Sequence, residues 1–230
     1  MRYRSKIIML LTGLILLLSV HVASAGLPDG LLYLDEVLPN INWDAKYYSC
    51  DNFTGKKVAG YEANRVVISE RMIEPLRKAA AHAERLSYKL LVFDATRPQR
   101  AVDNFVQWSH EKENGLTKKR FYPRIDNRID LFSKGFIASR SAHTQGRAID
   151  LTLVYQDGKM LDMGGHFDLF DVQSGIGATL NTEQEGHRWL LQMIMKKAGF
   201  FSYNEEWWHF YLMGSEDMVQ YYDFVIENNK

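Results

Sequence analysis

A carboxylate in the middle of an otherwise apolar run constrains the fold more than any other feature of this sequence. Residues 148–154 read Ala-Ile-Asp-Leu-Thr-Leu-Val, a length and composition typical of a buried strand, with Asp150 at its third position. Burying an ionised carboxylate is costly unless a positive group meets it. The fold must therefore bring either an arginine or a metal ion to Asp150. The spacing alone favours the arginine.

Three further segments define the main elements of the chain. Residues 89–93 predict a second buried strand, residues 206–212 predict an aromatic strand, and residues 70–87 carry apolar side chains at helical spacing. Strands and helices alternate irregularly, without a glycine-rich phosphate loop or a series of βαβ units. This pattern predicts an α+β fold: a single compact domain with a mostly antiparallel central sheet flanked by helices.

Turn and cap residues predict where two helices begin and end. Pro98 favours the first position of a helix, which places Arg97 at the N-cap. A capping box over residues 182–185 predicts the start of a later helix, which should end near Gly199. Residues 114–139 are polar and irregular, so we expect a long loop over the surface.

The first 25 residues have the pattern of an export signal. Basic residues within the first six positions precede a short apolar run, which closes on Ala-Ser-Ala at residues 23–25. An uncleaved anchor is the alternative, but the run is short for a membrane span and no cysteine follows it for a lipid anchor. We therefore expect a signal peptide over residues 1–25 and a periplasmic domain over residues 26–230, without a stable membrane anchor.

Composition excludes several kinds of partner and metal site. The 28 lysine and arginine residues balance 28 aspartate and glutamate residues, so net charge gives no reason to expect a nucleic-acid partner. The single cysteine, Cys50, allows neither an internal disulfide nor a cysteine-based metal cage. Any metal must be held by histidine, aspartate and glutamate. The oligomeric state stays open.

Histidines and carboxylates in two segments have the composition of a zinc site. His143 lies just before a glycine turn and seven residues before Asp150, while His209 follows Glu206 by three residues. His143, Asp150 and His209 together supply three ligands and leave a fourth position for water, as in catalytic zinc sites. Residues three apart on a regular strand point to opposite faces, so either Glu206 lies at the mouth of the strand or the backbone is irregular there.

Two further residues would complete a hydrolytic site. Glu206 is placed to take a proton from water as it attacks a carbonyl, and Arg97 follows a buried strand at a helix start, where it can stabilise the developing oxyanion. Each has a simpler interpretation. Glu206 can be an exposed residue of a packed aromatic strand, and Arg97 a surface residue paired with Asp94.

Five motifs follow one another along the mature chain: Trp43-Asp44-Ala45-Lys46-Tyr47, Asp51-Asn52-Phe53-Thr54-Gly55, Arg97-Pro98, the run from Ser141-Ala142-His143 to Asp150-Leu151-Thr152-Leu153, and Glu206-Trp207-Trp208-His209. In this order they resemble the VanX-type D-alanyl-D-alanine dipeptidases, zinc metallopeptidases related to the D,D-carboxypeptidases. The similarity extends from about Leu34 to Phe224. It implies the fold of the D-Ala-D-Ala metallopeptidases and hedgehog-like proteins, in agreement with the α+β prediction.

The resemblance implies an activity and a set of roles. It implies a hydrolase with one zinc ion (Zn2+) per chain that splits the small dipeptide D-Ala-D-Ala, and the preference for D stereochemistry rests wholly on it. The implied zinc ligands are His143, Asp150 and His209, with Glu206 as general base and Arg97 stabilising the tetrahedral intermediate. The residues implied to line the substrate pocket are Tyr47, Tyr61, Ser141 and Asp168, of which Asp168 and Tyr47 would face the free amino group.

Two departures from the family pattern concern local bonding and biological role. Ala142 stands where the family has serine before the first metal histidine, and the better-known members are cytoplasmic and lack a leader. A periplasmic member suggests a part in peptidoglycan turnover or remodelling.

Two alternative functions are a D,D-carboxypeptidase or endopeptidase acting on muropeptides and a catalytically silent zinc-binding domain. The presence of Glu206 and Arg97 argues against the silent domain, and Asp168 with Tyr47 argues against the carboxypeptidase.

Overall fold

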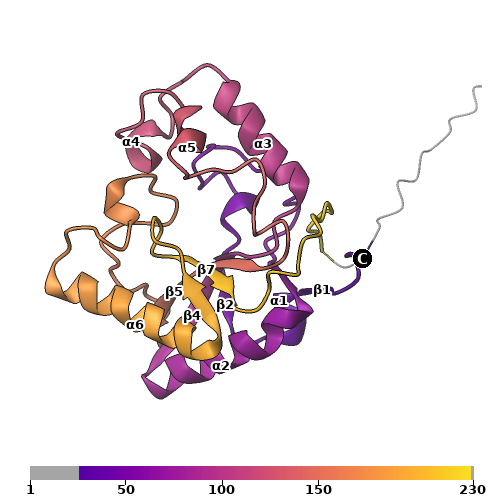
Figure 1. Cartoon of the computed structure of the whole chain (residues 1–230), viewed down its shortest axis with the longest axis vertical. Coiled ribbons are helices and arrows are strands. Elements are labelled where there is room, and N and C mark those ends of the chain that lie inside the picture. The colour runs from indigo at the N-terminus through magenta and orange to yellow at the C-terminus, as the bar shows by residue number, and fades with distance from the viewer. Residues whose placement is uncertain (1–25, 229–230) are drawn as a thin grey trace, which may run out of the picture.

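A mixed sheet of five strands carries two of the predicted metal ligands, Asp150 and His209. The computed structural model describes residues 26–228, so the predicted signal peptide lies outside the described residues. The strand order is β2-β4-β5-β7-β6 (Figure 1). The bounds are β2 Asn42–Trp43, β4 Tyr88–Asp94, β5 Ala148–Tyr155, β7 His209–Leu212 and β6 Phe200–Ser202. Within this sheet, as far as the structure describes it, only β2 and β4 pair in parallel, which confirms the mostly antiparallel prediction.

The central strand β5 is the run with the buried carboxylate. Its first seven residues are buried, because β4 and β7 flank it and side chains cover both of its faces. A separate two-stranded sheet joins β1 (Leu31–Tyr33) to β3 (Val67–Ser69). The sequence pattern predicted neither of these short strands.

Helices flank the sheet in two groups. Figure 1 shows α2 and α6 close together at one end and α3, α4 and α5 at the other. The helix bounds are α1 Leu34–Val37, α2 Ile73–Arg85, α3 Gln99–His110, α4 Lys118–Phe121, α5 Asp130–Ser133 and α6 Thr182–Ala198, with 3-10 turns at Lys46–Tyr48, Glu70–Met72 and Val172–Ser174. None of the helices within residues 26–228 is long and apolar enough to cross a membrane.

The start of α3 differs from the prediction by one residue. Pro98 is the N-cap, with an extended ψ of 148°, and Gln99 is the first helical residue. Arg97 was predicted as the N-cap and instead precedes the cap. It belongs to the segment that joins β4 to α3, so its side chain is free to turn back toward the sheet.

The capping box of α6 also lies one residue earlier than predicted. Asn181 accepts a hydrogen bond from the backbone of Gln184, and the Gln184 side chain accepts one from the backbone of Asn181. The predicted end is confirmed, since Gly199 caps the helix with a φ of 101°, a left-handed conformation that favours glycine.

Residues 114–139 are not the surface loop that their polar composition predicted. The short helices α4 and α5 lie within the segment, and Phe121, Tyr122 and Leu131 are buried. Arg128 is buried as well, and its guanidinium donates hydrogen bonds to Glu113 and to the Tyr122 hydroxyl. Polar residues surround these few buried apolar side chains, so the average composition of the segment does not indicate that it contributes to the core.

The side chain of Arg188 on α6 forms hydrogen bonds with the loop of residues 163–175, which contains Asp168. Arg188 is 4% exposed, and its guanidinium donates to the carbonyl oxygens of Met163 (2.6 Å), Gln173 (2.8 Å) and Gly175 (2.8 Å). Burial lowers the pKa of this arginine to about 10. The three bonds tie both ends of the segment 163–175 to one helix, with Asp168 between them.

Replacing Arg188 by methionine should lower the free energy of unfolding by about 3 kcal/mol, because one buried and two partly buried carbonyl oxygens lose a charged donor. Urea denaturation of the purified protein measures this change. The matched control is Lys196→Met, which removes an exposed cation from the same helix and should leave stability nearly unchanged. Equal effects in the two variants would show that the three carbonyl bonds contribute little.

Candidate active site

Three neighbouring strands of the sheet each place one ionisable side chain at the same register position. Asp150 on β5 is the register partner of Asp94 on β4 and of His209 on β7. Directly opposed residues of neighbouring strands project from the same face, so the three side chains meet. His143 reaches these side chains from the turn that precedes β5, where the backbone of Gly146 donates to the His143 carbonyl. Register thus brings together residues that are far apart in the chain.

The geometry of His143, Asp150 and His209 suits a divalent metal ion. All three side chains are buried, and their ligand atoms lie within 4.8 Å of one another. Asp150 Oδ2 is 3.2 Å from His143 Nε2, Asp150 Oδ1 is 2.9 Å from His209 Nδ1, and the two imidazole nitrogens are 3.1 Å apart. Two imidazoles and one carboxylate match the donor set of catalytic zinc sites.

The surroundings of His143 and Asp150 favour the same interpretation. His143 Nδ1 lies 2.7 Å from the carbonyl oxygen of Ala95, which fixes the hydrogen on Nδ1 and leaves the Nε2 lone pair directed at the cluster. Burial alone would raise the pKa of Asp150, but its contacts with His143 and His209 outweigh burial and hold that pKa well below its usual range. Asp150 is therefore held ionised, the state in which a carboxylate binds a cation.

Glu206 lies in the turn before β7, at the mouth of the strand. This is the first of the two placements that the sequence allowed, since β7 begins only at His209. The backbone of Trp207 donates to the carbonyl of Ser174 and so fixes the turn. Glu206 Oε2 is 3.8 Å from His209 Nδ1. Burial, followed by the charges of Asp150 and other carboxylates, raises the pKa of Glu206, which suits a proton acceptor in the cluster.

Arg97 is held behind the cluster by Asp94. Arg97 Nε donates to Asp94 Oδ2 at 2.9 Å, and Arg97 Nη2 lies 3.6 Å from Asp150 Oδ2. Tyr61 donates to the other Asp94 oxygen at 2.6 Å. The Arg97 side chain is only 12% exposed, so the surface pairing considered from sequence does not describe it. Asp94 appeared in the sequence analysis only as a surface partner of Arg97, and the structure makes it a residue of the site; its position at the end of an apolar strand signalled this role.

Asp168 is a buried carboxylate with a tyrosine as its partner. It is 4% exposed and accepts hydrogen bonds from the Tyr47 hydroxyl, at 3.0 and 3.3 Å to its two oxygens. Its φ of 60° is rare outside glycine and is kept because the surrounding structure imposes it. Burial and the nearby charge of Asp150 raise its pKa. A carboxylate held in this way is ready to receive a cationic group.

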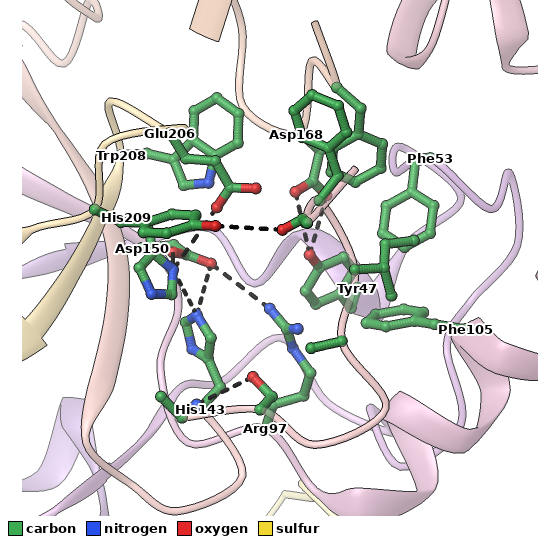
Figure 2. A pocket seen from close by; sticks show the side chains of 18 of the residues that line it. Tyr47, Phe53, Arg97, Phe105, His143, Asp150, Asp168, Glu206, Trp208 and His209 are labelled. Carbon is green, nitrogen blue, oxygen red and sulfur yellow. Dashed lines mark hydrogen bonds and ion pairs between the residues drawn. The ribbon is translucent and has the colours of Figure 1, made fainter. Parts of the chain in front are cut away.

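One cavity connects these side chains, as Figure 2 shows. Its polar lining includes Tyr47, Arg97, Ser141, His143, Asp150, Asp168, Glu206 and His209. The apolar part of the wall includes Phe53, Phe105, Phe170 and Trp208. Tyr61 does not line the cavity and instead lies behind Arg97, where it supports Asp94. A cavity whose wall combines three carboxylates with aromatic side chains suits a small polar ligand with a positive group.

The C-terminal segment fastens two parts of the site to each other. The backbone of Tyr222 donates to the carbonyl of Thr144 at 3.0 Å, and its own carbonyl accepts from Gln99 at 2.9 Å. Thr144 follows His143, and Gln99 lies two residues after Arg97. The segment therefore joins the turn of the first histidine to the start of α3.

Comparison with known proteins gives one consistent result. The family described as D-ala-D-ala dipeptidase, Peptidase_M15, matches residues 28–227. A D-alanyl-D-alanine dipeptidase of Enterococcus faecalis is 44% identical, with 86% of this chain and 98% of the relative covered. Proteins of the same name from Streptomyces coelicolor and Escherichia coli are 43% and 31% identical, covering 84% and 79% of this chain and 96% and 84% of the relatives. The chain therefore belongs to the Peptidase_M15 family of D-Ala-D-Ala dipeptidases, which are metallopeptidases.

Proposed function

We propose that this protein hydrolyses D-Ala-D-Ala to two D-alanines with zinc held by His143, Asp150 and His209. The observation that carries the proposal is the buried convergence of these three donors beside Glu206 and Asp168. The relatives that cover most of the chain carry the name of this activity, which supports the choice of substrate.

Different residues of the chain would transfer the proton and stabilise the developing negative charge during hydrolysis. Zinc, when bound, lowers the pKa of a water molecule toward ~7 and polarises a carbonyl group. Glu206, whose pKa burial already raises, would take a proton from the attacking water and pass it to the leaving amine. Arg97 would stabilise negative charge that develops on the carbonyl oxygen, and Asp94 keeps its guanidinium in place before the substrate arrives.

Asp168 would select substrates with a free amino group. It is buried, and its hydrogen-bond partner is the neutral hydroxyl of Tyr47. A substrate ammonium would therefore give this carboxylate a positively charged partner. A substrate with an acylated amine would leave the carboxylate desolvated without a cation, which costs binding energy. The enzyme would therefore act on free dipeptides in preference to acylated peptides.

We further propose that the enzyme works in the periplasm and acts in peptidoglycan turnover or remodelling. The basic start, apolar run and Ala-Ser-Ala sequence at residues 23–25 support this location. Fractionation of cells that produce the full chain tests it. Release of the protein from the periplasm, with residues 1–25 removed, is expected. Retention in the cytoplasm would contradict the proposal.

The test of the activity uses zinc-loaded protein of residues 26–230 and the Asp168→Asn variant. Release of alanine is measured from D-Ala-D-Ala, L-Ala-L-Ala and N-acetyl-D-Ala-D-Ala. We expect hydrolysis of the free D,D-dipeptide alone, and a loss of about a hundredfold in kcat/KM in Asp168→Asn with unchanged zinc content.

Three outcomes of this panel would contradict the account. Equal hydrolysis of the acetylated substrate would indicate a carboxypeptidase. Zinc loss in step with activity would make Asp168 structural. Absence of turnover by the zinc-loaded protein on every substrate would indicate a binding domain.

A further inference from the structure

Two arginines line the cavity, and only one of them is engaged by carboxylates. Arg97 contacts Asp94 and Asp150, as described above. Arg140 lies in the segment before the first histidine, is exposed, and forms no ion pair with any carboxylate in the described part of the chain. The cavity thus has an unpaired cation at its exposed rim and the carboxylates Asp168 and Glu206 in its interior.

A free dipeptide carries opposite charges at its two ends. With its ammonium at Asp168, its α-carboxylate must be placed away from the acidic interior, because like charges in a desolvated site repel strongly. A carboxylate left without a donor would lose its hydration and gain nothing in return. The dipeptide therefore needs a hydrogen-bond donor in the cavity wall at its other end, and a cationic donor forms the strongest bond to a carboxylate.

The described lining offers few candidates for that cation. No lysine lies among the described residues of the wall, and the two imidazoles belong to the cluster with Asp150. Arg97 is buried between two aspartates, so its positive charge is already balanced. Arg140 alone among the described lining residues combines a positive charge with freedom from an acidic partner.

The side chain of Arg140 has a neighbour that can hold it at the rim. Its guanidinium carbon lies 5.4 Å from the centroid of the Tyr221 ring, a distance at which a cation is attracted to an aromatic face. A guanidinium against a ring keeps its N–H groups free at its edge, where they bind a carboxylate through two parallel hydrogen bonds. Ser141, the next residue, lines the same wall.

We propose that Arg140 binds the α-carboxylate of the dipeptide and sets the length of the substrate at its C-terminal end. This inference rests on the proposed dipeptidase function and extends it. Asp168 binds the ammonium at one end and Arg140 binds the carboxylate at the other. The substrate class is therefore a zwitterionic peptide of two residues. A peptide extended or amidated at its C-terminus would lack the charge that Arg140 requires.

The experiment compares the zinc-loaded wild-type protein with Arg140→Gln, Arg140→Lys and the matched control Lys134→Gln. Lys134 lies in the same segment but does not line the cavity. Steady-state kinetics are measured on D-Ala-D-Ala and on its C-terminal amide. For the free dipeptide, Arg140→Gln should raise KM about tenfold with little change in kcat, as expected for loss of one charge-assisted contact at an exposed site. Arg140→Lys should recover part of the loss.

The amide separates recognition of the carboxylate from a structural effect. Because it has no carboxylate, its KM should be the same in the wild-type protein and in Arg140→Gln. Lys134→Gln should resemble the wild type on both substrates. Equal effects of Arg140→Gln on both substrates, or none on either, would overturn the inference while leaving the dipeptidase proposal intact. A wild-type protein that hydrolyses neither substrate with zinc bound would overturn both.

Discussion

Replacing Glu206 by glutamine is expected to leave the metal content unchanged and to lower kcat on D-Ala-D-Ala by at least about a thousandfold. Glutamine has nearly the shape of glutamate, so the turn before β7 can stay in place. The amide has no basic oxygen with which to take a proton from water. Metal analysis of the purified variant and a stopped assay for D-alanine release measure the two quantities in one preparation.

The neighbouring glutamate supplies the control for this variant. Glu205 is exposed and does not line the cavity, so Glu205→Gln removes the same charge one residue away. It should keep nearly full activity. Turnover of Glu206→Gln close to that of the wild type, with metal bound, would remove Glu206 from the role of general base.

Replacing His143 by alanine is expected to abolish both metal binding and turnover. Two ligands are too few for a tight zinc site, and the buried Asp150 would lose one of the groups that balance its charge. The variant should therefore also melt at a lower temperature than the wild-type protein. Metal analysis, kinetics and thermal unfolding are measured on the same sample.

His110→Ala is the control, because His110 is exposed at the end of α3 and far in sequence from the cluster. It should bind one metal ion and keep its activity. A fully metal-loaded His143→Ala protein would exclude His143 from the ligand set. The contrast with Glu206→Gln distinguishes a residue that holds the metal from one that moves a proton.

The parts of the fold with strong periodicity were predictable from the sequence. The apolar runs at β4 and β5 and the amphipathic α2 are long enough to carry their own pattern. The edge strand β2 has only two residues, Asn42 and Trp43, and exists because β4 offers it hydrogen-bonding partners. No local pattern can reveal a strand whose pairing partners lie 49 residues away along the chain, because such pairing is decided by the tertiary structure.

The site was predictable as a set of residues but not as an arrangement. The buried Asp150 already demanded a positive partner, and the structure surrounds it with His143, His209 and Arg97. The sequence placed Arg97 at an N-cap and weighed a surface pairing with Asp94. The structure contains the pairing with Asp94, but it is buried within the site, because the register of β4 against β5 sets Asp94 opposite Asp150.

The two backbone hydrogen bonds of Tyr222, which join Thr144 to Gln99, bear on the stage of folding at which the protein can bind a metal ion. A chain emerges from a ribosome or an export pore with its N-terminus first. His143 and Asp150 are then available before β7 has supplied His209, and before Tyr222 has bridged Thr144 and Gln99. A metal centre built from these three donors would therefore be complete only when nearly the whole chain has been released, and its ion would enter a protein that has largely folded.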